Sequence, residues 1–546
     1  MIERRARELL VMDLRGTGRS GVLRCRALER TGIASVADAA AECASALGAR
    51  RGFYTARDSA EDVESVRRAL GVEKIALFGV SYGARVALTY AQRYPDRVDR
   101  LLLQSPPPPE GEDLLYRSAL AAVPAVVKAR CGRRGCRRAS RSPAADVVAL
   151  AKQLERGPIP GSVVDGDGSR RSLHLRGRDL FEALGGTGFP SFSFPDSGSL
   201  LGLIRNARRG DVAPLLRARQ TTIRYRRILP SSDAPRRFSA AAYAASICEE
   251  SVLPWPRTTP LEGRYATALA LAFALPPGAF GPFGPRTALE SDRVHLCSRW
   301  PVASAPPDPP RVLPAIPTLI LAGEQDLAAP VAHAEAVARL IPGARVMRVV
   351  GPDSELDLSS GSCPLSAVEA FLGRSPRGKC YQPRKRWPAL PPPPLSLADL
   401  DPEPGASGRA GRTMAAVRLT LRDGAGHLAL RFFVRVLTPG VGRRQLYRSP
   451  VRAGALRRGT YRLGFRRPGF ELRDASYVPG VRVSGLVRPR ERHGGARPRG
   501  HLRVGGPAAA RGRLVLRGRV LSGRLGGRPV RMRIGAAAYP DISFGR

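Results

Sequence analysis

Lysine is nearly absent from this 546-residue chain: five of its 89 basic residues are lysine and the rest are arginine. Together with frequent Ala, Gly and Pro, this composition is typical of a GC-rich genome whose codon bias supplies arginine throughout. If the excess of arginine instead reflects the function of the protein, the formal net charge of +43 favours anionic partners such as cell-wall polymers, lipid headgroups or nucleic acid. Both interpretations stay open from composition alone.

Long apolar runs are also missing. No stretch approaches the roughly 18 uninterrupted apolar residues of a membrane-spanning helix, so we expect no membrane span. The first five residues carry no apolar signal segment. The eight cysteines include no C-x-x-C pair and no histidine spacing typical of zinc, so we expect no metal and no other cofactor. An even number of cysteines instead favours four disulfides in a protein that is secreted or held in the cell envelope.

The chain is organised around residues 73–106. An apolar run of strand length, Ile75 to Phe78, leads directly into G-V-S-Y-G at 79–83 and then into an Ala-rich helical stretch. In this context G-x-S-x-G is typical of a nucleophile elbow, a turn so tight that both flanking positions must be glycine and the serine hydroxyl is exposed. Ser81 is therefore the candidate nucleophile, and the alternative is a Gly-rich turn that happens to hold a serine. Val98 to Leu103 is the next expected buried strand, which predicts a parallel sheet.

Several segments in order along the chain resemble one family. They are D-L-R-G-T-G-R-S-G at 13–21, F-Y-T-A-R-D at 53–58, the elbow, P-T-L-I-L-A-G-E-Q-D at 317–326 and S-C-P-L-S-A-V-E-A-F-L at 362–372. Together they resemble the prolyl and tripeptidyl aminopeptidase branch of the α/β-hydrolases, especially its secreted actinobacterial members. The resemblance covers most of residues 9–385 and implies an α/β fold, the α/β-hydrolase fold, with a parallel sheet and a helical lid.

In that family, strands and a Gly-rich loop precede the first of these motifs, and the loop gives one N–H group of the oxyanion hole. This sequence shows no such segment before Leu9, where a strand from Leu9 to Asp13 is expected. We therefore expect the fold to be N-terminally incomplete, through a truncated gene model that also lost a signal peptide or through degeneration.

The expected domain organisation follows from the motifs and from shifts in composition. Residues 1–108 and 309–383 form the two parts of the hydrolase core, and residues 109–308 form the helical lid. A Pro-rich linker at 384–404 precedes a basic region at 405–546, which holds 32 Arg against 5 acidic residues. Alternating apolar and polar residues predict a separate all-β domain there, a sandwich or barrel. Its expected strands are Val417–Leu421, Leu428–Val434, Arg482–Leu486, Gly512–Val520 and Val530–Ile534.

The resemblance also implies further parts of the catalytic apparatus. The triad acid of such folds follows a strand at a G-E-x-D turn, so Asp326 is the candidate, the alternative being a cap of the next helix. The backbone N–H of Tyr82, after the elbow, is the visible oxyanion donor. Lid carboxylates hold the substrate's α-ammonium group in such aminopeptidases, which makes Glu249 and Glu250 candidates, with a solvated helix end as the alternative.

A catalytic histidine is the missing part. The family carries it in the loop after Val350, where Asp353 or Ser354 occupies its position here. The nearest of the six histidines, His333, is expected within a helix, at its surface or partly packed. Because loss of the histidine alone can cost about 10⁶ in rate, the polypeptide as written should be a poor catalyst.

Four disulfides are expected. Local pairing predicts three of them, and the resemblance adds the pair of Cys248 with Cys297. The local pairs are Cys25 with Cys43, Cys131 with Cys136, and Cys363 with Cys380.

The sequence therefore favours an exported serine hydrolase that cleaves peptide or ester bonds of a small-molecule or peptide substrate through an acyl-enzyme. The alternative is a noncatalytic envelope protein that keeps the lid pocket and binds an anionic cell-envelope polymer through its basic β domain. A nucleic-acid binder ranks third, because no recognised reading motif accompanies the charge, and no nucleic acid is expected as a partner.

Overall fold

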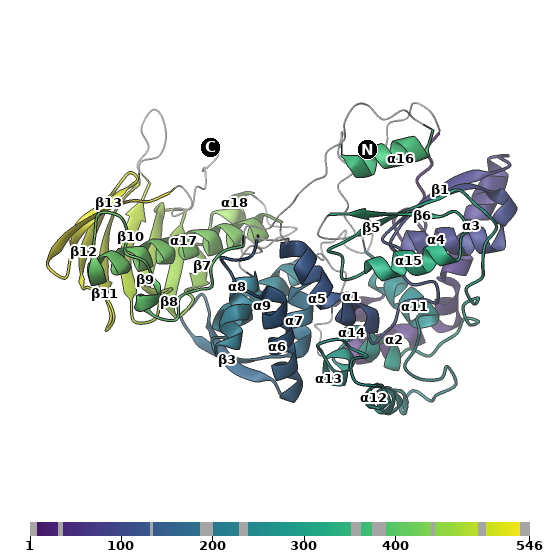
Figure 1. Cartoon of the computed structure of the whole chain (residues 1–546), viewed down its shortest axis with the longest axis horizontal. Coiled ribbons are helices and arrows are strands. Elements are labelled where there is room, and N and C mark those ends of the chain that lie inside the picture. Colours follow the sequence, from purple (N-terminus) through teal and green to yellow (C-terminus); the bar gives the residue numbers. More distant parts are fainter. Residues whose placement is uncertain are drawn as a thin grey trace.

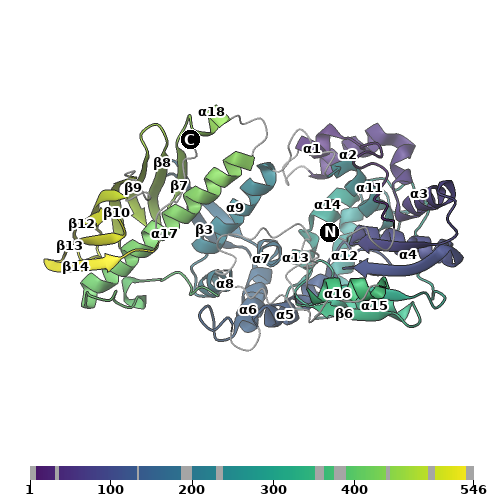
Figure 2. The same ribbon diagram turned by 90° about the horizontal axis from the view of Figure 1, so that it is seen from above.

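The computed structural model describes residues 8–30, 36–131, 135–185, 200–228, 238–350, 362–373, 389–437, 443–489 and 498–535. Within these residues an α/β core lies at one end of the molecule and a large β-sheet with one long helix lies at the other (Figure 1). A mostly helical region lies between the two, as the view from above also shows (Figure 2).

The core sheet has four parallel strands. Their order is β1 (Ile75–Val80), β2 (Val98–Gln104), β5 (Thr318–Gly323) and β6 (Arg345–Val349). Strands β1, β2 and β5 lie where the sequence predicts them, and β5 is buried along its whole length, as in a strand covered on both faces. The α/β-hydrolase fold with a parallel sheet is therefore confirmed.

Helices cover both faces of this sheet. Three of them share an apolar core with one face, namely α3 (Ala56–Ala69), α4 (Tyr82–Arg93) and α15 (Val331–Arg339). Helix α16 (Cys363–Phe371) packs on the other face, against β5 and β6. The helix expected around His333 is α15.

The strand expected at Leu9 to Asp13 is wrong. The segment pairs with no strand among the described residues, and Leu9, Leu10 and Val11 are 57%, 61% and 82% exposed. An apolar run can form a strand only where a neighbouring strand pairs with it. In the described sheet β1 is the edge strand, and Phe78 and Val80 on it are each 42% exposed.

The motif that follows this segment forms a closed loop. The backbone N–H of Arg19 donates to the Asp13 carboxylate (2.8 Å), and Gly18 has a φ of +49°. A Cβ at Gly18 would lie 2.2 Å from that carboxylate, so only glycine fits there. Arg15 reaches out of the loop to the carboxylate of Asp62 on α3, with a contact of 2.6 Å.

The region between β2 and β5 is predominantly helical, as the resemblance implies. Its helices pack with α1 (Arg26–Arg30) and α2 (Val36–Leu47) around one large apolar core, and a hairpin of β3 (Ile159–Val164) and β4 (Arg170–Leu175) lies at its border. The helices are α5 (Arg117–Cys131), α6 (Pro143–Arg156), α7 (Gly177–Ala183), α8 (Leu200–Arg208), α9 (Ala213–Ile228), α11 (Ala240–Glu250), α12 (Arg264–Ala274), α13 (Pro285–Leu289) and α14 (Asp292–Ser298).

Three of the four expected disulfides are confirmed. They join Cys25 to Cys43, Cys131 to Cys136 and Cys248 to Cys297. The fourth pairing involves Cys380, which lies outside the described residues.

The C-terminal β domain is confirmed as a single antiparallel sheet of eight strands. Each strand pairs with the next along the chain, so the sheet is an open meander rather than a sandwich or barrel. The strands are β7 (Val451–Gly454), β8 (Arg458–Gly464), β9 (Gly469–Ser476), β10 (Arg482–Arg488), β11 (Arg499–Gly505), β12 (Gly512–Arg517), β13 (Val520–Leu525) and β14 (Arg528–Arg533). The stretch predicted as one strand at Gly512–Val520 is divided at Gly518, whose φ of +63° makes the turn between β12 and β13.

Two segments expected as strands, Val417–Leu421 and Leu428–Val434, lie instead in helix α17 (Gly408–Leu437). Over five residues the apolar positions alternate, but over the longer window Met414, Val417, Leu421 and Leu428 recur at helical spacing. These four side chains are buried against one face of the sheet. A short helix, α18 (Arg443–Leu446), then leads into β7.

The two ends of the molecule are tied through the helical region. Arg217 of α9 makes a two-armed ion pair with Asp423 of α17, at 2.6 and 2.9 Å. Arg457, just before β8, makes a second two-armed pair with Asp211, before α9. The C-terminal region therefore docks on α9 through paired charges.

A candidate active site at the carboxyl edge of the core sheet

Ser81 stands between β1 and α4 in a strained backbone conformation. Its φ of 51° and ψ of −116° place a non-glycine residue at positive φ, as a nucleophile elbow requires, and its side chain is exposed. The Ser81 N–H donates to the carbonyl of Gln104 on β2 (2.9 Å), and the Ser81 carbonyl accepts from the N–H of Ala84 (2.9 Å). The neighbouring strand and the first turn of α4 thus hold the strained residue in place.

The two glycines of the elbow are not equivalent. A Cβ at Gly79 would lie 2.3 Å from the carbonyl oxygen of Gly83, so a side chain there would block the close approach of strand and helix. A Cβ at Gly83 would meet nothing within 4 Å. The expectation that both flanking positions must be glycine is therefore wrong for Gly83.

Tyr82 is the first residue of α4. Its backbone N–H is one of the first four of the helix, which have no partner within the helix and lie at its positive end. Its phenol donates a hydrogen bond to Glu250 (2.7 Å), and burial raises the phenol pKa well above its usual value. The side chain is therefore fixed away from Ser81 while the backbone N–H stays at the elbow.

Asp326 follows β5 and is buried, with 3% of its surface exposed. One carboxylate oxygen accepts from the N–H groups of Ala328 (2.9 Å) and Ala329 (3.0 Å), which is what a cap or turn residue does. The other oxygen, Oδ2, meets no donor with hydrogen-bond geometry among the described residues, although the Ser105 hydroxyl and the Arg130 guanidinium lie near the carboxylate. Burial raises the pKa of the Asp326 carboxyl. One oxygen thus shapes the turn and the other remains able to accept from a base.

Ser81 and Asp326 lie at the same edge of the sheet. Strands β1, β2 and β5 are parallel neighbours, and the two residues follow the carboxyl ends of β1 and β5. Asp353 and Ser354, the expected positions of the missing histidine, lie outside the described residues. They follow β6, the next strand along the same edge.

His333 lies in the first turn of α15, within a helix as expected, but it is buried rather than at the surface. Its Nε2 is 2.7 Å from the hydroxyl oxygen of Ser118 on α5, and its Nδ1 has no partner among the described residues. Burial lowers the pKa of His333, which favours the neutral imidazole at neutral pH. Sequence reasoning missed this serine–histidine pair, since 215 positions separate the two residues and no motif joins them.

The carboxylates at the end of α11 differ in their surroundings. Glu249 is fully buried, and its oxygens accept from Trp300 Nε1 (3.0 Å) and from the N–H groups of Ala303 (2.9 Å) and Ser304 (2.8 Å). Glu249 therefore holds the segment 300–304 against the end of α11. The interpretation of these two glutamates as a solvated helix end is wrong, because Glu250 too is only 7% exposed.

Glu250 joins the elbow to a cavity. It accepts from the N–H of Ala56 (2.7 Å) and from the phenol of Tyr82 (2.7 Å), and one oxygen lies 3.7 Å from Nε of Arg85. Burial raises the pKa of the Glu250 carboxyl. Because Tyr82 directly follows Ser81, Glu250 contacts the turn that holds Ser81.

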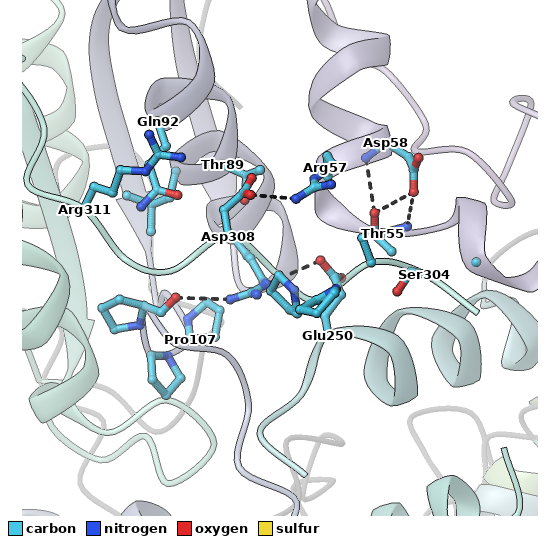
Figure 3. A pocket seen from close by; sticks show the side chains of 18 of the residues that line it. Thr55, Arg57, Asp58, Thr89, Gln92, Pro107, Glu250, Ser304, Asp308 and Arg311 are labelled. Atoms are coloured by element: carbon cyan, nitrogen blue, oxygen red, sulfur yellow. Dashed lines mark hydrogen bonds and ion pairs between the residues drawn. The ribbon is translucent and has the colours of Figure 1, made fainter. Parts of the chain in front are cut away.

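The cavity has a volume of about 260 Å³. Figure 3 shows Glu250 with Thr55 and Ser304 on one side, and Gln92 with Arg311 on the other. Its walls come from α3, α4, the segment 303–313 and the prolines at 107–109. Ser81 is not among the lining residues, so the cavity lies beside the elbow and meets it through Glu250 and Tyr82.

Two protein-family models match parts of the sequence. The family described as "alpha/beta hydrolase fold" matches residues 2–156, and that described as "TAP-like protein" matches residues 283–379. The proline iminopeptidases of Neisseria gonorrhoeae and Neisseria meningitidis are 44% identical over 50 residues, which is 9% of this chain. The chain spans 16% of the length of these relatives.

The solved structures that match the chain are more distant in sequence. One of them is titled "Novel epoxide hydrolases belonging to the alpha/beta hydrolases superfamily in metagenomes from hot environments" and is 18% identical. The match covers 59% of this chain and 75% of the other chain, with a TM-score of 0.27. A thermophilic esterase from Thermogutta terrifontis is 17% identical and covers 54% of this chain and 64% of its own, with a TM-score of 0.20.

Proposed function

Because this chain is an α/β-hydrolase that resembles the TAP-like branch, we propose that it hydrolyses peptide or ester bonds through an acyl-enzyme formed on Ser81. The observation that carries the proposal is the backbone of Ser81, a non-glycine residue at positive φ at the end of β1 with an exposed side chain. Such strain persists where surrounding structure enforces it, and here it exposes a hydroxyl at the start of a helix.

The proposed steps use groups at the sheet edge. A base removes the Ser81 proton, and the serine oxygen attacks the carbonyl carbon to form a tetrahedral oxyanion. The N–H of Tyr82 donates to that oxyanion, and the protonated base then gives its proton to the leaving amine or alcohol. Water hydrolyses the ester in a second round. Asp326 orients and stabilises the base through Oδ2, which meets no donor with hydrogen-bond geometry among the described residues.

The base belongs in the loop after β6, where Asp353 or Ser354 takes the place of a histidine. A carboxylate there would be repelled by Asp326, and a hydroxyl is a very weak base at neutral pH. We therefore propose that the chain as it stands hydrolyses slowly.

For the substrate we propose a peptide or small molecule with a free amino group, held by Glu250 rather than by Glu249. Glu250 lines the cavity and lies against the elbow residue Tyr82, whereas the oxygens of Glu249 accept from Trp300 and from the backbone at Ala303 and Ser304. A buried carboxylate favours a cationic partner, which offsets the cost of its own burial. Export, to the medium or the envelope, is supported by the three disulfides, which persist in oxidising compartments.

The test restores the missing base. Asp353→His or Ser354→His should raise hydrolysis of a nitrophenyl ester or an aminoacyl anilide by orders of magnitude, because an imidazole would then stand opposite Asp326. The gain should vanish when Ser81→Ala is added. Asp357→His, in the same loop, is the matched control and should bring no gain.

Two outcomes would overturn parts of the proposal. If the unmodified chain is already fast and His333→Ala abolishes that activity, His333 is the base and the loop assignment is wrong. If neither histidine variant gains activity although both fold, the Ser81 proposal loses its main support.

A further inference from the structure

One face of the C-terminal sheet is basic across five neighbouring strands. Strands β10 to β14 carry eight exposed arginines and one exposed histidine on the face turned away from α17, and they contain no acidic residue. The alternating positions, such as Leu502, Val504 and Leu514, are buried in the core shared with α17. We call the exposed set the arginine face. It consists of Arg488, Arg499, His501, Arg503, Arg513, Arg517, Arg524, Arg531 and Arg533.

The strand register places arginines directly opposite one another. Arg503 faces Arg513, which faces Arg524 on the next strand. A second row has Arg488 opposite Arg499, which lies opposite Arg517. Neighbouring strands are about 4.8 Å apart, and like charges directly opposite each other destabilise a sheet. The sheet therefore keeps two rows of three like charges that oppose its own folding.

The same sheet neutralises arginines elsewhere. On β8 and β9, Glu471 forms ion pairs with Arg462 (3.3 Å) and Arg473 (2.6 Å). None of the eight arginines of the arginine face forms an ion pair with a described residue. The arginine face is thus the part of the sheet where unpaired guanidinium groups gather on one surface.

We propose that the arginine face binds a linear phosphodiester polymer that lacks bases. Guanidinium forks bind phosphate oxygens in two-armed geometry, and a row of them suits a polymer better than a single anion. The other residues turned outward on these strands offer no aromatic ring on which a base would stack. They are Arg482, which pairs with Asp474 of β9 (4.0 Å), and Ser484, Leu486, Gly505, Val515, Val520, Ser522 and Pro529.

The spacing along each strand also fits such a polymer. Residues i and i+2 on one face of a strand lie about 6.7 Å apart. Three backbone bonds of an extended chain span roughly 3.5 Å, so the six bonds between phosphates joined by a three-carbon unit span roughly 7 Å. An extended polymer can therefore place its phosphates over the arginines of one strand. Arginines two residues apart would meet phosphates of successive repeats, and arginines four residues apart, such as Arg513 and Arg517, would meet every second phosphate. The proposal does not depend on the hydrolase activity.

The test compares two triple variants of the full chain. Arg503→Gln, Arg513→Gln and Arg524→Gln together remove one row, and Arg448→Gln, Arg466→Gln and Arg467→Gln remove the same charge from exposed positions elsewhere in the same region. Binding to poly(glycerol phosphate) is measured by calorimetry at several salt concentrations. The row variant should bind about tenfold more weakly or worse, with a salt slope reduced by about 2 to 3, while the control keeps most of the affinity.

Folding is checked by the thermal midpoint, which should not fall in the row variant, since three mutually repelling charges are removed. Equal loss of binding in both triple variants would mean that net charge alone binds the polymer and would overturn the proposal. Tighter binding of an oligothymidylate than of poly(glycerol phosphate), or binding only to vesicles of phosphatidylglycerol and phosphatidylcholine, would overturn it as well.

Discussion

Asp326 shows at the scale of a single residue how a buried group can serve the site at the expense of stability. Burial raises its pKa, so the folded chain holds the proton more tightly than the unfolded chain does. The resulting contribution to stability is complete below the unfolded pKa and is lost as the pH rises through the raised folded pKa. Above that raised pKa the folded protein bears a buried carboxylate, and the cost of burying this charge lowers stability.

Asp326→Asn should accordingly raise the thermal midpoint at neutral pH, because the amide oxygen can still accept from Ala328 and Ala329 while the buried charge is gone. The difference from the unmodified protein should shrink as the pH falls through the raised folded pKa of Asp326 and should be gone at about pH 4 and below, where the aspartate is protonated in both the folded and the unfolded chain. In the Asp353→His background the same change should lower hydrolysis by about 10⁴. A lower midpoint at neutral pH would show that the carboxylate has a stabilising partner.

The two glutamates of α11 should separate function from structure. Glu249→Ala leaves the buried donors of Trp300 and of the backbone at Ala303 and Ser304 without partners, so it should lower the free energy of unfolding by about 3 kcal/mol or more, measured by urea titration. Glu250→Gln keeps an acceptor oxygen for Ala56, and its amide N–H can donate to the phenol oxygen of Tyr82, so it should cost far less.

With the base restored, Glu250→Gln should raise KM for substrates with a free amino group and leave N-acylated substrates unaffected. An equal change for both substrates would argue against amine recognition by Glu250.

The positions of Ser81 and Asp326 at the ends of strands could be predicted from sequence motifs, because each residue follows a strand whose apolar run is visible in the sequence. The Ser118–His333 pair and the arginine rows could not be predicted. They depend on how α5 meets α15 and on the register of separate strands, which no local pattern encodes.

At the scale of elements, α17 shows where short patterns mislead. Two five- to seven-residue alternations predict strands, while the helical spacing becomes visible only over some fifteen residues. Strands β2 and β5 were predictable because parallel strands buried on both faces show continuous apolar runs. The order of strands in the C-terminal sheet and its single-layer form depend on the packing of α17 instead.

Two glycines of α17 give a matched test of that packing. A Cβ at Gly424 would lie 2.6 Å from the ring of Tyr461 and 2.7 Å from that of Phe470, whereas a Cβ at Gly426 meets nothing within 4 Å. Gly426→Ala should stabilise the protein by up to about 1 kcal/mol through helix propensity. Gly424→Ala should destabilise it by about 1 to 3 kcal/mol because the helix must move off the sheet. Thermal unfolding measures both, and equal effects would contradict the packing of α17 on β8 and β9.

At the scale of the whole molecule, charge pairs hold the C-terminal region on the helical region. Asp423 is buried and receives Arg217 from α9 and the phenol of Tyr461 from β8. Burial alone would raise the pKa of Asp423, but the Arg217 guanidinium and His427 hold it below its usual range. A pair of this kind is costly to break from one side, because a buried charge is left alone.

Limited proteolysis should cut the linker between Arg384 and Arg412 and leave both parts folded. The parts should stay together through the Arg217–Asp423 contact and elute as one species in size-exclusion chromatography. Asp423→Ala should lower stability by about 3 to 5 kcal/mol and release the C-terminal part, whereas Arg458→Ala, which breaks an exposed pair with Asp474, should change stability by less than about 1 kcal/mol. A C-terminal part that is unfolded after release would show that it is not an autonomous domain.

The nucleophile is the central claim, and covalent labelling tests it most directly. The full chain is incubated with a fluorophosphonate and the modified residue is located by peptide mass spectrometry. The account predicts a single adduct on Ser81, slow to form in the unmodified chain, faster in Asp353→His and absent in Ser81→Ala. An adduct on Ser118, beside His333, or labelling that persists in Ser81→Ala would contradict it.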